Sequence, residues 1–202
     1  MRIEIVTAPT IEPITVAEAK TYCRIDSDLT DENALIGSLI TAAREHIEVL
    51  TSRALAPQTV RLVLDKFPKY SKLPLPRFPL ISVSTVDYDD ADEAEQTWAD
   101  SKYTVDPDGM PGAIYALEAW PATSPAPGSV RITYTCGYQI EDGEGEEASE
   151  IIPARAKQAI YYLVNHWYEN RDTVIVGSIA TKLPMAVESL IAPLKIYYRS
   201  PQ

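Results

Sequence analysis

Apolar residues recur at helical spacing near the end of the chain, over residues 153–171 (PARAKQAIYYLVNHWYENR). Five of them fall on one face of the predicted helix: Ala156, Ile160, Leu163, Val164 and Trp167. Tyr161 and Tyr168, seven residues apart, add a second aromatic line beside that face. An apolar surface this wide predicts a helix that packs on more than one side.

Two further helices are predicted near the start of the chain. Thr15 and Glu18 have capping-box spacing and predict a short helix through about Cys23. A longer helix is predicted over about 31–50. Its inward stripe is Ile36, Leu39, Ile40, Ala43, Ile47 and Leu50, and its outward positions are Thr41, Arg44, Glu45 and Glu48. Gly37 lowers the helix propensity by about 1 kcal/mol relative to alanine and hints at close packing.

The pattern changes to alternation between residues 58 and 138. Strands are predicted at 59–67, 82–88 and 129–138, with shorter ones at 102–105 and 112–117, because each run is bounded by Pro, Gly or Asp clusters. The acidic run 87–95 then falls at the tip of a hairpin. Together these elements predict a small antiparallel sheet.

The last part of the chain has weaker signals. Residues 172–182 have no sustained period and predict a loop that is mobile or ordered by a partner. A last helix is predicted to begin near Pro184, with Val187, Leu190 and Ile191 inward, and to end at Pro193.

The predicted fold class is α+β, with a helical core and an inserted small antiparallel sheet. We expect one domain over 1–202. It is divided into N-terminal helices (14–56), a β insertion (57–139), an acidic loop (140–152) and C-terminal helices with a tail (153–202).

Composition fits a soluble globular protein, with 46% hydrophobic and 23% charged residues. No stretch reaches the length of a membrane span and no signal peptide is recognisable, so we expect folding in the cytoplasm. Cys23 and Cys136 lie far apart and are predicted to be buried free thiols.

The formal net charge of −11 is carried by two stretches, 87–95 and 141–150, which together hold 12 of the 29 acids. The remaining 17 acids nearly balance the 18 bases. Such a chain has no basic footprint with which to bind nucleic acid.

The sequence contains no pattern that predicts catalysis, a metal site or a cofactor. His46 and His166 are the two histidines, and each is predicted to be a structural residue within a helix. Calcium loops started at Asp87 or Asp142 place Asp92 or Glu147 where glycine is required. A carboxylate-dependent hydrolase that uses the acidic loops is the alternative from another functional class.

Six motifs in order resemble those of bacteriophage head–tail connector (adaptor) proteins. They are ITVAEAKTYCRID, DENALIGSLITAAREHIEVLTSRAL, LPLPRFPLISVSTVDY, VRITYTCGY, IPARAKQAIYYLVNHWYENRD and LPMAVESLIAPLK. The resemblance spans about 14–195, and its most specific pieces are HWYENR and LPMAVESLIAP. The family usually has glycine where Ser52 stands, and LPFGV-like residues at 183–187.

The resemblance implies a non-enzymatic structural protein of the virion neck, made in the host bacterial cytoplasm. It implies a ring, expected to be twelvefold, that assembles under the portal protein, extends the DNA channel and receives the next neck protein. DNA would pass without sequence-specific binding, and no membrane is implied. Another neck or tail-completion protein of the same region, from a phage or a prophage, is the nearest alternative.

Two groups of candidate site residues follow from this hypothesis. Aromatic residues and arginine dominate interface hot spots. The candidate interface residues are therefore Trp167, Tyr168, Arg171, Tyr197, Tyr198 and Arg199. Carboxylates repel phosphate, and the candidate channel-facing acids are Asp89, Asp90, Asp92, Glu144, Glu146 and Glu147. We also expect deletion of 194–202 to weaken docking more than it destabilises the fold.

Overall fold

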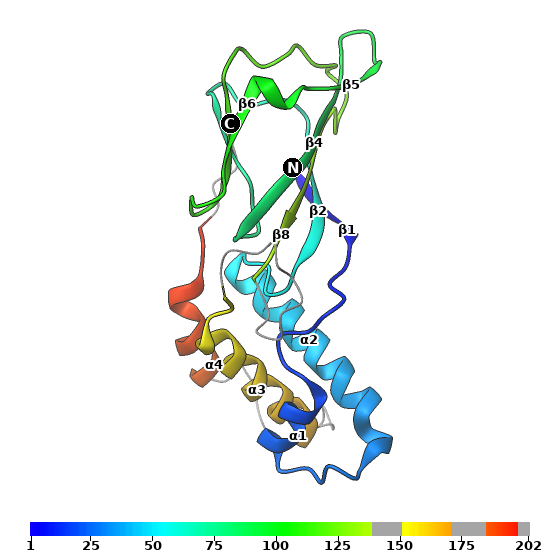
Figure 1. The fold of residues 1–202 in the computed structure, drawn as a ribbon, viewed down its shortest axis with the longest axis vertical. Coiled ribbons are helices and arrows are strands. Elements are labelled where there is room, and N and C mark those ends of the chain that lie inside the picture. Colours follow the sequence, from blue (N-terminus) through cyan, green and yellow to red (C-terminus); the bar gives the residue numbers. More distant parts are fainter. Residues whose placement is uncertain (139–150, 171–184, 198–202) are drawn as a thin grey trace, which may run out of the picture. The chain divides into compact units, whose positions relative to one another are not determined.

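A computed structural model of the 202-residue chain describes residues 1–138, 151–170 and 185–197. Its internal contacts divide the chain into two compact units (Figure 1). One unit comprises Met1–Thr10, Ser52–Ile151 and Ile196–Gln202, and we call it the β unit. The other comprises Ile11–Thr51 and Ile152–Lys195, and we call it the helical unit. The expected single-domain boundary of 1–202 stays a prediction.

The β unit contains two antiparallel sheets. The larger has the strand order β1-β2-β8-β4-β5, and the smaller has the order β3-β7-β6. The strands are β1 (Arg2–Thr7), β2 (Gln58–Leu64), β3 (Lys72–Pro74), β4 (Leu80–Asp89), β5 (Glu95–Thr97), β6 (Tyr103–Asp106), β7 (Ala113–Ala116) and β8 (Val130–Cys136). A 3₁₀ turn, η2 (Asp100–Lys102), precedes β6. The predicted α+β class is confirmed, and so are the predicted strands.

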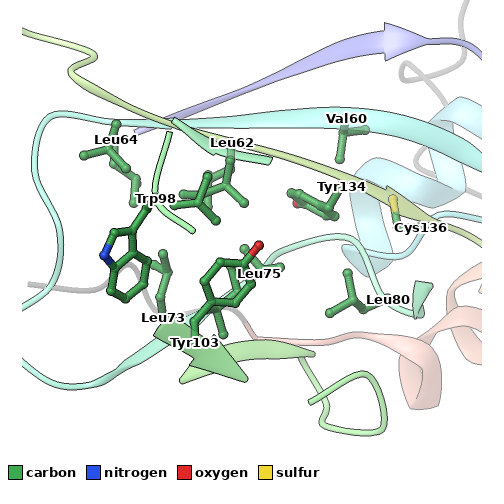
Figure 2. Close-up of a cluster of buried hydrophobic side chains, with 14 of the residues drawn as sticks. Val60, Leu62, Leu64, Leu73, Leu75, Leu80, Trp98, Tyr103, Tyr134 and Cys136 are labelled. Carbon is green, nitrogen blue, oxygen red and sulfur yellow. The ribbon is translucent and has the colours of Figure 1, made fainter. Parts of the chain in front are cut away.

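The core of the β unit is filled by residues that alternate along the strands. Val60, Leu62 and Leu64 of β2 are all buried, and so are Ile132 and Tyr134 of β8. Figure 2 shows side chains of the larger sheet together with those of the smaller one in a single apolar cluster. Because both sheets contribute to it, the two sheets share one core.

Three strands were not predicted. β1 pairs with β2, β3 pairs with β7, and β5 pairs with β4. β3 and β5 have only three residues each, which is too short to show a period of two. β1 reads RIEIVT, but Ile5 is 57% exposed, so its pattern does not match its burial.

The helical unit contains α1 (Val16–Cys23), α2 (Asn33–Thr51), α3 (Ala154–Glu169) and α4 (Met185–Ile191). The 3₁₀ turns η1 (Thr30–Glu32) and η3 (Ala192–Leu194) precede α2 and follow α4. The capping box of α1 is confirmed, since the Glu18 amide donates to Thr15 Oγ1 and the Thr15 amide donates to Glu18 Oε2. Pro193 lies in η3, where the last helix tightens and ends.

α3 packs on more than one side, as predicted, because α1, α2 and α4 all contact it. Its buried residues are Ala156, Ala159, Ile160, Leu163 and Val164. Trp167 and Tyr161 are half-buried. In α4, Val187 and Ile191 are buried as predicted. The predicted loop at 172–182 lies outside the described residues.

The prediction that Arg44 and Glu48 face outward is wrong. Their side chains are 5% and 4% exposed. Arg44 Nη1 donates to Glu48 Oε2 at 3.1 Å, and Arg44 Nε donates to Glu12 Oε2 at 2.8 Å. A helical-wheel argument places charged residues outside because an unpaired buried charge is costly, but these charges meet partners that the wheel does not show.

Ser52 follows α2 with a φ of +57°, in the left-handed region that favours glycine. The glycine that the connector family usually has at this place fits that backbone conformation. At Gly37, in contrast, an added Cβ would meet only Val16 Cγ2 at 4.0 Å, which is ordinary contact. Close packing therefore does not explain Gly37.

Candidate assembly surfaces

The acidic run 87–95 forms the β4–β5 hairpin, in which Asp87 pairs with Thr97 and Asp89 pairs with Glu95. Asp90 holds the turn together. Its Oδ1 accepts the amides of Asp92 and Ala94 at 3.0 Å each, and its Oδ2 accepts from Gln96 Nε2 at 2.9 Å. These hydrogen bonds, led by the one from the Ala94 amide, hold the pKa of Asp90 below its usual value. The predicted hairpin tip is confirmed.

Arg131 of β8 fixes the base of this hairpin. Its two terminal nitrogens donate to Asp89 at 2.9 and 2.6 Å, and Nη2 also donates to Glu95 at 2.9 Å. The hydrogen bonds from Arg131 hold the pKa of Asp89 below its usual value. A two-pronged arginine–carboxylate contact is the strong form of an ion pair. The hairpin is therefore a fixed structure.

These contacts give the three candidate channel-facing acids of the hairpin different roles. Asp89 is engaged by Arg131, and the carboxylate of Asp90 is turned toward its own backbone. Asp92 is exposed at the turn and keeps its charge available to a partner. Glu144, Glu146 and Glu147 lie outside the described residues, so which acidic segment faces a channel stays a prediction.

The helical unit presents an aromatic cluster that the sequence did not indicate. Tyr22 of α1 stacks on Tyr161 of α3 with ring centroids 5.0 Å apart, and it meets Tyr162 edge-on at 6.1 Å. Burial, followed by the neighbouring Tyr162, raises the pKa of Tyr22. Burial and then Glu18 raise the pKa of Tyr161. Tyr162 is 40% exposed, so the cluster offers an amphipathic edge at the surface.

Two candidate interface residues on α3 have partners inside the helical unit. The half-buried Trp167 meets His46 edge-on with ring centroids 6.1 Å apart. The Tyr168 hydroxyl donates to the carboxylate of Glu32. Both residues help to join α3 to α2 and its leading turn. A role at an interface stays a prediction for both, and Arg171 lies outside the described residues.

The C-terminal segment changes from buried to exposed between residues 194 and 197. Leu194 is buried, whereas Tyr197 is 89% exposed. A tyrosine this exposed makes little use of its apolar ring within the subunit, which suits a contact with another molecule. Tyr198 and Arg199 lie outside the described residues.

The described residues contain no cluster of three or more His, Cys, Asp or Glu side chains that could hold a metal ion. Over the same ranges, no helix has the length and hydropathy that crossing a bilayer requires. Both cysteines are free thiols. Cys136 is buried as predicted, whereas Cys23 is only half-buried.

A family model described as "Head completion protein" matches residues 12–179. Among solved structures, a chain from the neck of an empty gene transfer agent (GTA) particle, computed with C6 symmetry, is 27% identical with a TM-score of 0.78. A chain from the virion of a native GTA particle is 27% identical with a TM-score of 0.75. A chain from the neck of a native GTA particle, computed with C12 symmetry, is 26% identical with a TM-score of 0.74. Each match covers 100% of this chain and 99% of the other. No curated protein matches the chain.

Proposed function

The chain belongs to the head completion protein family and is a structural protein of the virion's head–tail neck, and we propose that it acts there, without catalysis, as one subunit of a ring. The ring lies under the portal protein, extends the DNA channel and receives the next neck protein. One observation carries the proposal: full-length similarity to chains from necks computed with C6 and C12 symmetry. Twelve copies is the number we propose.

The distribution of charge supports passage of DNA through such a ring. The chain has a net charge of −11, and the stretch 141–150 alone holds six acids. Carboxylates lining a channel repel phosphate, so that DNA slides along the wall without being held.

The roles of the hairpin carboxylates favour a structural protein over a hydrolase. Asp89 and Asp90 accept hydrogen bonds from Arg131 and from backbone amides that fix the turn. A catalytic pair needs one carboxyl group with a raised pKa to act as acid. Both of these carboxyl groups have their pKa lowered instead.

The experiment that tests the proposal removes the gene and examines the particles by electron microscopy. We expect DNA-filled heads without tails, and restoration of tailed particles when the gene is supplied from a plasmid. Density for a ring of this chain below the portal in the restored particles would locate it. Heads that still join tails in the absence of the gene would refute the proposal.

A second comparison separates the connector from the hydrolase. Asp89→Asn, Asp90→Asn, Glu144→Gln and Glu146→Gln together would abolish turnover in a carboxylate-dependent enzyme. In the connector the same variant still joins heads to tails, although DNA exit slows as the repulsive charge is reduced.

A further inference from the structure

One surface of the β unit has a charge opposite to that of the chain as a whole. Residues 66–86 contain four bases and no acid, directly before the run 87–95, which contains six acids and no base. The exposed bases of this segment are Lys66, Lys69 and Lys72, and Tyr70 is exposed among them. With the neighbouring Leu117 they form what we call the lysine–tyrosine face. Tyr70 is 78% and Leu117 is 66% exposed.

The lysine–tyrosine face is rigidly supported from behind. Phe67 stacks on Trp120 with ring centroids 4.7 Å apart and an interplanar angle of 11°. Trp120 Nε1 donates to the carbonyl of Tyr70 at 2.8 Å, and the Ala116 amide donates to the Ser71 carbonyl at 2.9 Å. A loop held at both its side chains and its backbone loses little freedom on binding.

The charge of this face has no acidic counterpart in ion-pair contact within the described ranges. Lys102, close by in the chain fold, pairs with Glu118 at 2.9 Å. Among the described residues no carboxylate forms an ion pair with Lys66, Lys69 or Lys72. The ammonium of Lys72 instead lies 5.2 Å from the ring centroid of Tyr115. Three lysines beside an exposed tyrosine are suited to an acidic partner.

The acidic β4–β5 hairpin lies at the same end of the larger sheet. Both β2 and β4 pair antiparallel with β8, and Leu64 and Tyr88 face the same residue, Val130. The lysine–tyrosine face comes directly after the end of β2, and the turn of the hairpin comes directly after the end of β4. The two strands therefore end at the same height along β8, one on each side of it. In Figure 1 the loop of the hairpin is found next to the label of β5.

We propose that the lysine–tyrosine face of one copy docks on the acidic β4–β5 hairpin of the next copy around the ring. The proposal rests on the ring assembly proposed above. A ring needs two different surfaces that meet head to tail, and rotation about an axis along the strands joins surfaces at the same level. These two surfaces have opposite charge, are preformed and lie within the same compact unit.

DNA is the other polyanion that could meet three lysines. The hairpin is the partner that the charges favour, because six acids lie at the same end of the sheet and would repel a phosphate backbone approaching the lysines. The exposed tyrosine and leucine add apolar area of the kind that protein interfaces use.

The test reverses the charges on each surface and then on both. One full-length variant carries Lys66→Glu and Lys69→Glu, and another carries Asp92→Lys and Glu93→Lys. Each is expected to lower the yield of tailed particles by at least about tenfold, because like charges then meet across the interface. The variant with all four changes restores opposite charges and is expected to recover the yield. Asp108→Lys and Arg155→Glu, which are exposed elsewhere, serve as controls that leave the yield unchanged.

Thermal unfolding of each purified variant distinguishes loss of assembly from loss of fold, and we expect melting temperatures close to that of the wild type. Failure of the fourfold variant to do better than the two double variants overturns the docking, and so does normal assembly of either double variant. Normal assembly combined with altered DNA retention in the lysine variant would assign the face to DNA instead. If wild-type particles contain no ring of this chain, the proposed function is refuted, and the docking proposal, which rests on the ring, is refuted as well.

Discussion

Replacement of Arg44 by methionine tests whether the buried charge network stabilises the helical unit. The Arg44 side chain is 5% exposed and bonds Glu12 at 2.8 Å and Glu48 at 3.1 Å. Burial disfavours the charged guanidinium, but the hydrogen bond that Arg44 donates to Glu12 and the charges of Glu48 and Glu12 outweigh it and raise the pKa of Arg44. Arg44 is therefore a charged group, as arginine side chains in proteins are.

The expected magnitude follows from what the substitution leaves behind. Methionine fills much of the volume of the arginine stem, so the cost comes from two carboxylates that lose the cation between them. Removal of one partner from a buried ion pair typically costs about 3–5 kcal/mol. We expect the free energy of unfolding of Arg44→Met to fall by that amount, with Glu12, whose side chain is 28% exposed, contributing the smaller part.

The chain provides a matched control for this substitution. Arg2 Nε also lies 2.8 Å from a carboxylate, that of Glu4, but the two side chains are 70% and 39% exposed. Exposed pairs contribute about 0–1 kcal/mol. Arg2→Met should therefore leave the free energy of unfolding nearly unchanged. Because the N–O distance is 2.8 Å in both pairs, the difference between the two variants isolates the effect of burial.

Urea unfolding followed by circular dichroism and by tryptophan fluorescence measures both variants. Trp167 lies on α3 and meets His46 of α2, so its part of the emission reports on the helical unit, whereas Trp98 and Trp120 report on the core of the β unit. A second variant, Arg44→Met with Glu12→Gln and Glu48→Gln, removes the remaining charges and should recover part of the loss. A loss below about 1 kcal/mol for Arg44→Met, or one that disappears in about 0.5 M salt as a screened surface pair would, refutes the reasoning.

Four further predictions use other parts of the structure. Gly37→Ala should stabilise the protein by up to about 1 kcal/mol in the same urea assay, because the added methyl group meets one side-chain atom at 4.0 Å. Gly112→Ala should destabilise the protein, because the added Cβ would lie 2.7 Å from Cβ of the buried Leu80. The Asp89 carboxyl, titrated by NMR, should have a pKa below its usual value that rises in Arg131→Lys. Since the folded-state pKa is the lower one, the stability from this pair is present above the unfolded-state value and is lost as the pH falls through the folded-state value. Deletion of residues 196–202 should leave the melting temperature nearly unchanged and reduce the yield of tailed particles, whereas a melting temperature that drops sharply with normal yield would contradict the assembly role of the tail.

Periodicity predicted the elements that are long and one-sided, and it failed where partners come from elsewhere in the chain. The stripe of α2 includes Ile36, Ile40 and Ile47, all buried as expected. The same wheel placed Arg44 outside, because it could not show that Glu12, 32 positions earlier, would reach it. Burial of a charge depends on tertiary partners, which a single helix does not encode.

In the candidate surfaces, too, the local pattern predicted the element but not the contacts of its individual side chains. The sequence predicted that 87–95 forms a hairpin tip, because acids and turn residues separate two alternating runs. It could not distinguish Asp90, which closes the turn, from Asp92, which faces solvent, since both are aspartates in the same run. The stacking of Tyr22 on Tyr161 joins residues 139 positions apart in the chain, and no local pattern marks such a pair.

The tail gives the clearest case in which the structure changes an experiment. The predicted deletion began at Leu194, but Leu194 is buried and its loss would remove a core contact along with the tail. Removal of a buried leucine side chain typically costs about 2–5 kcal/mol. A deletion from 194 would therefore mix instability with loss of docking, whereas one that begins at 196 removes exposed residues such as Tyr197 and leaves α4 and η3 complete. Because neck assembly and folding are separate equilibria, only the shorter deletion assigns a loss of tailed particles to the interface.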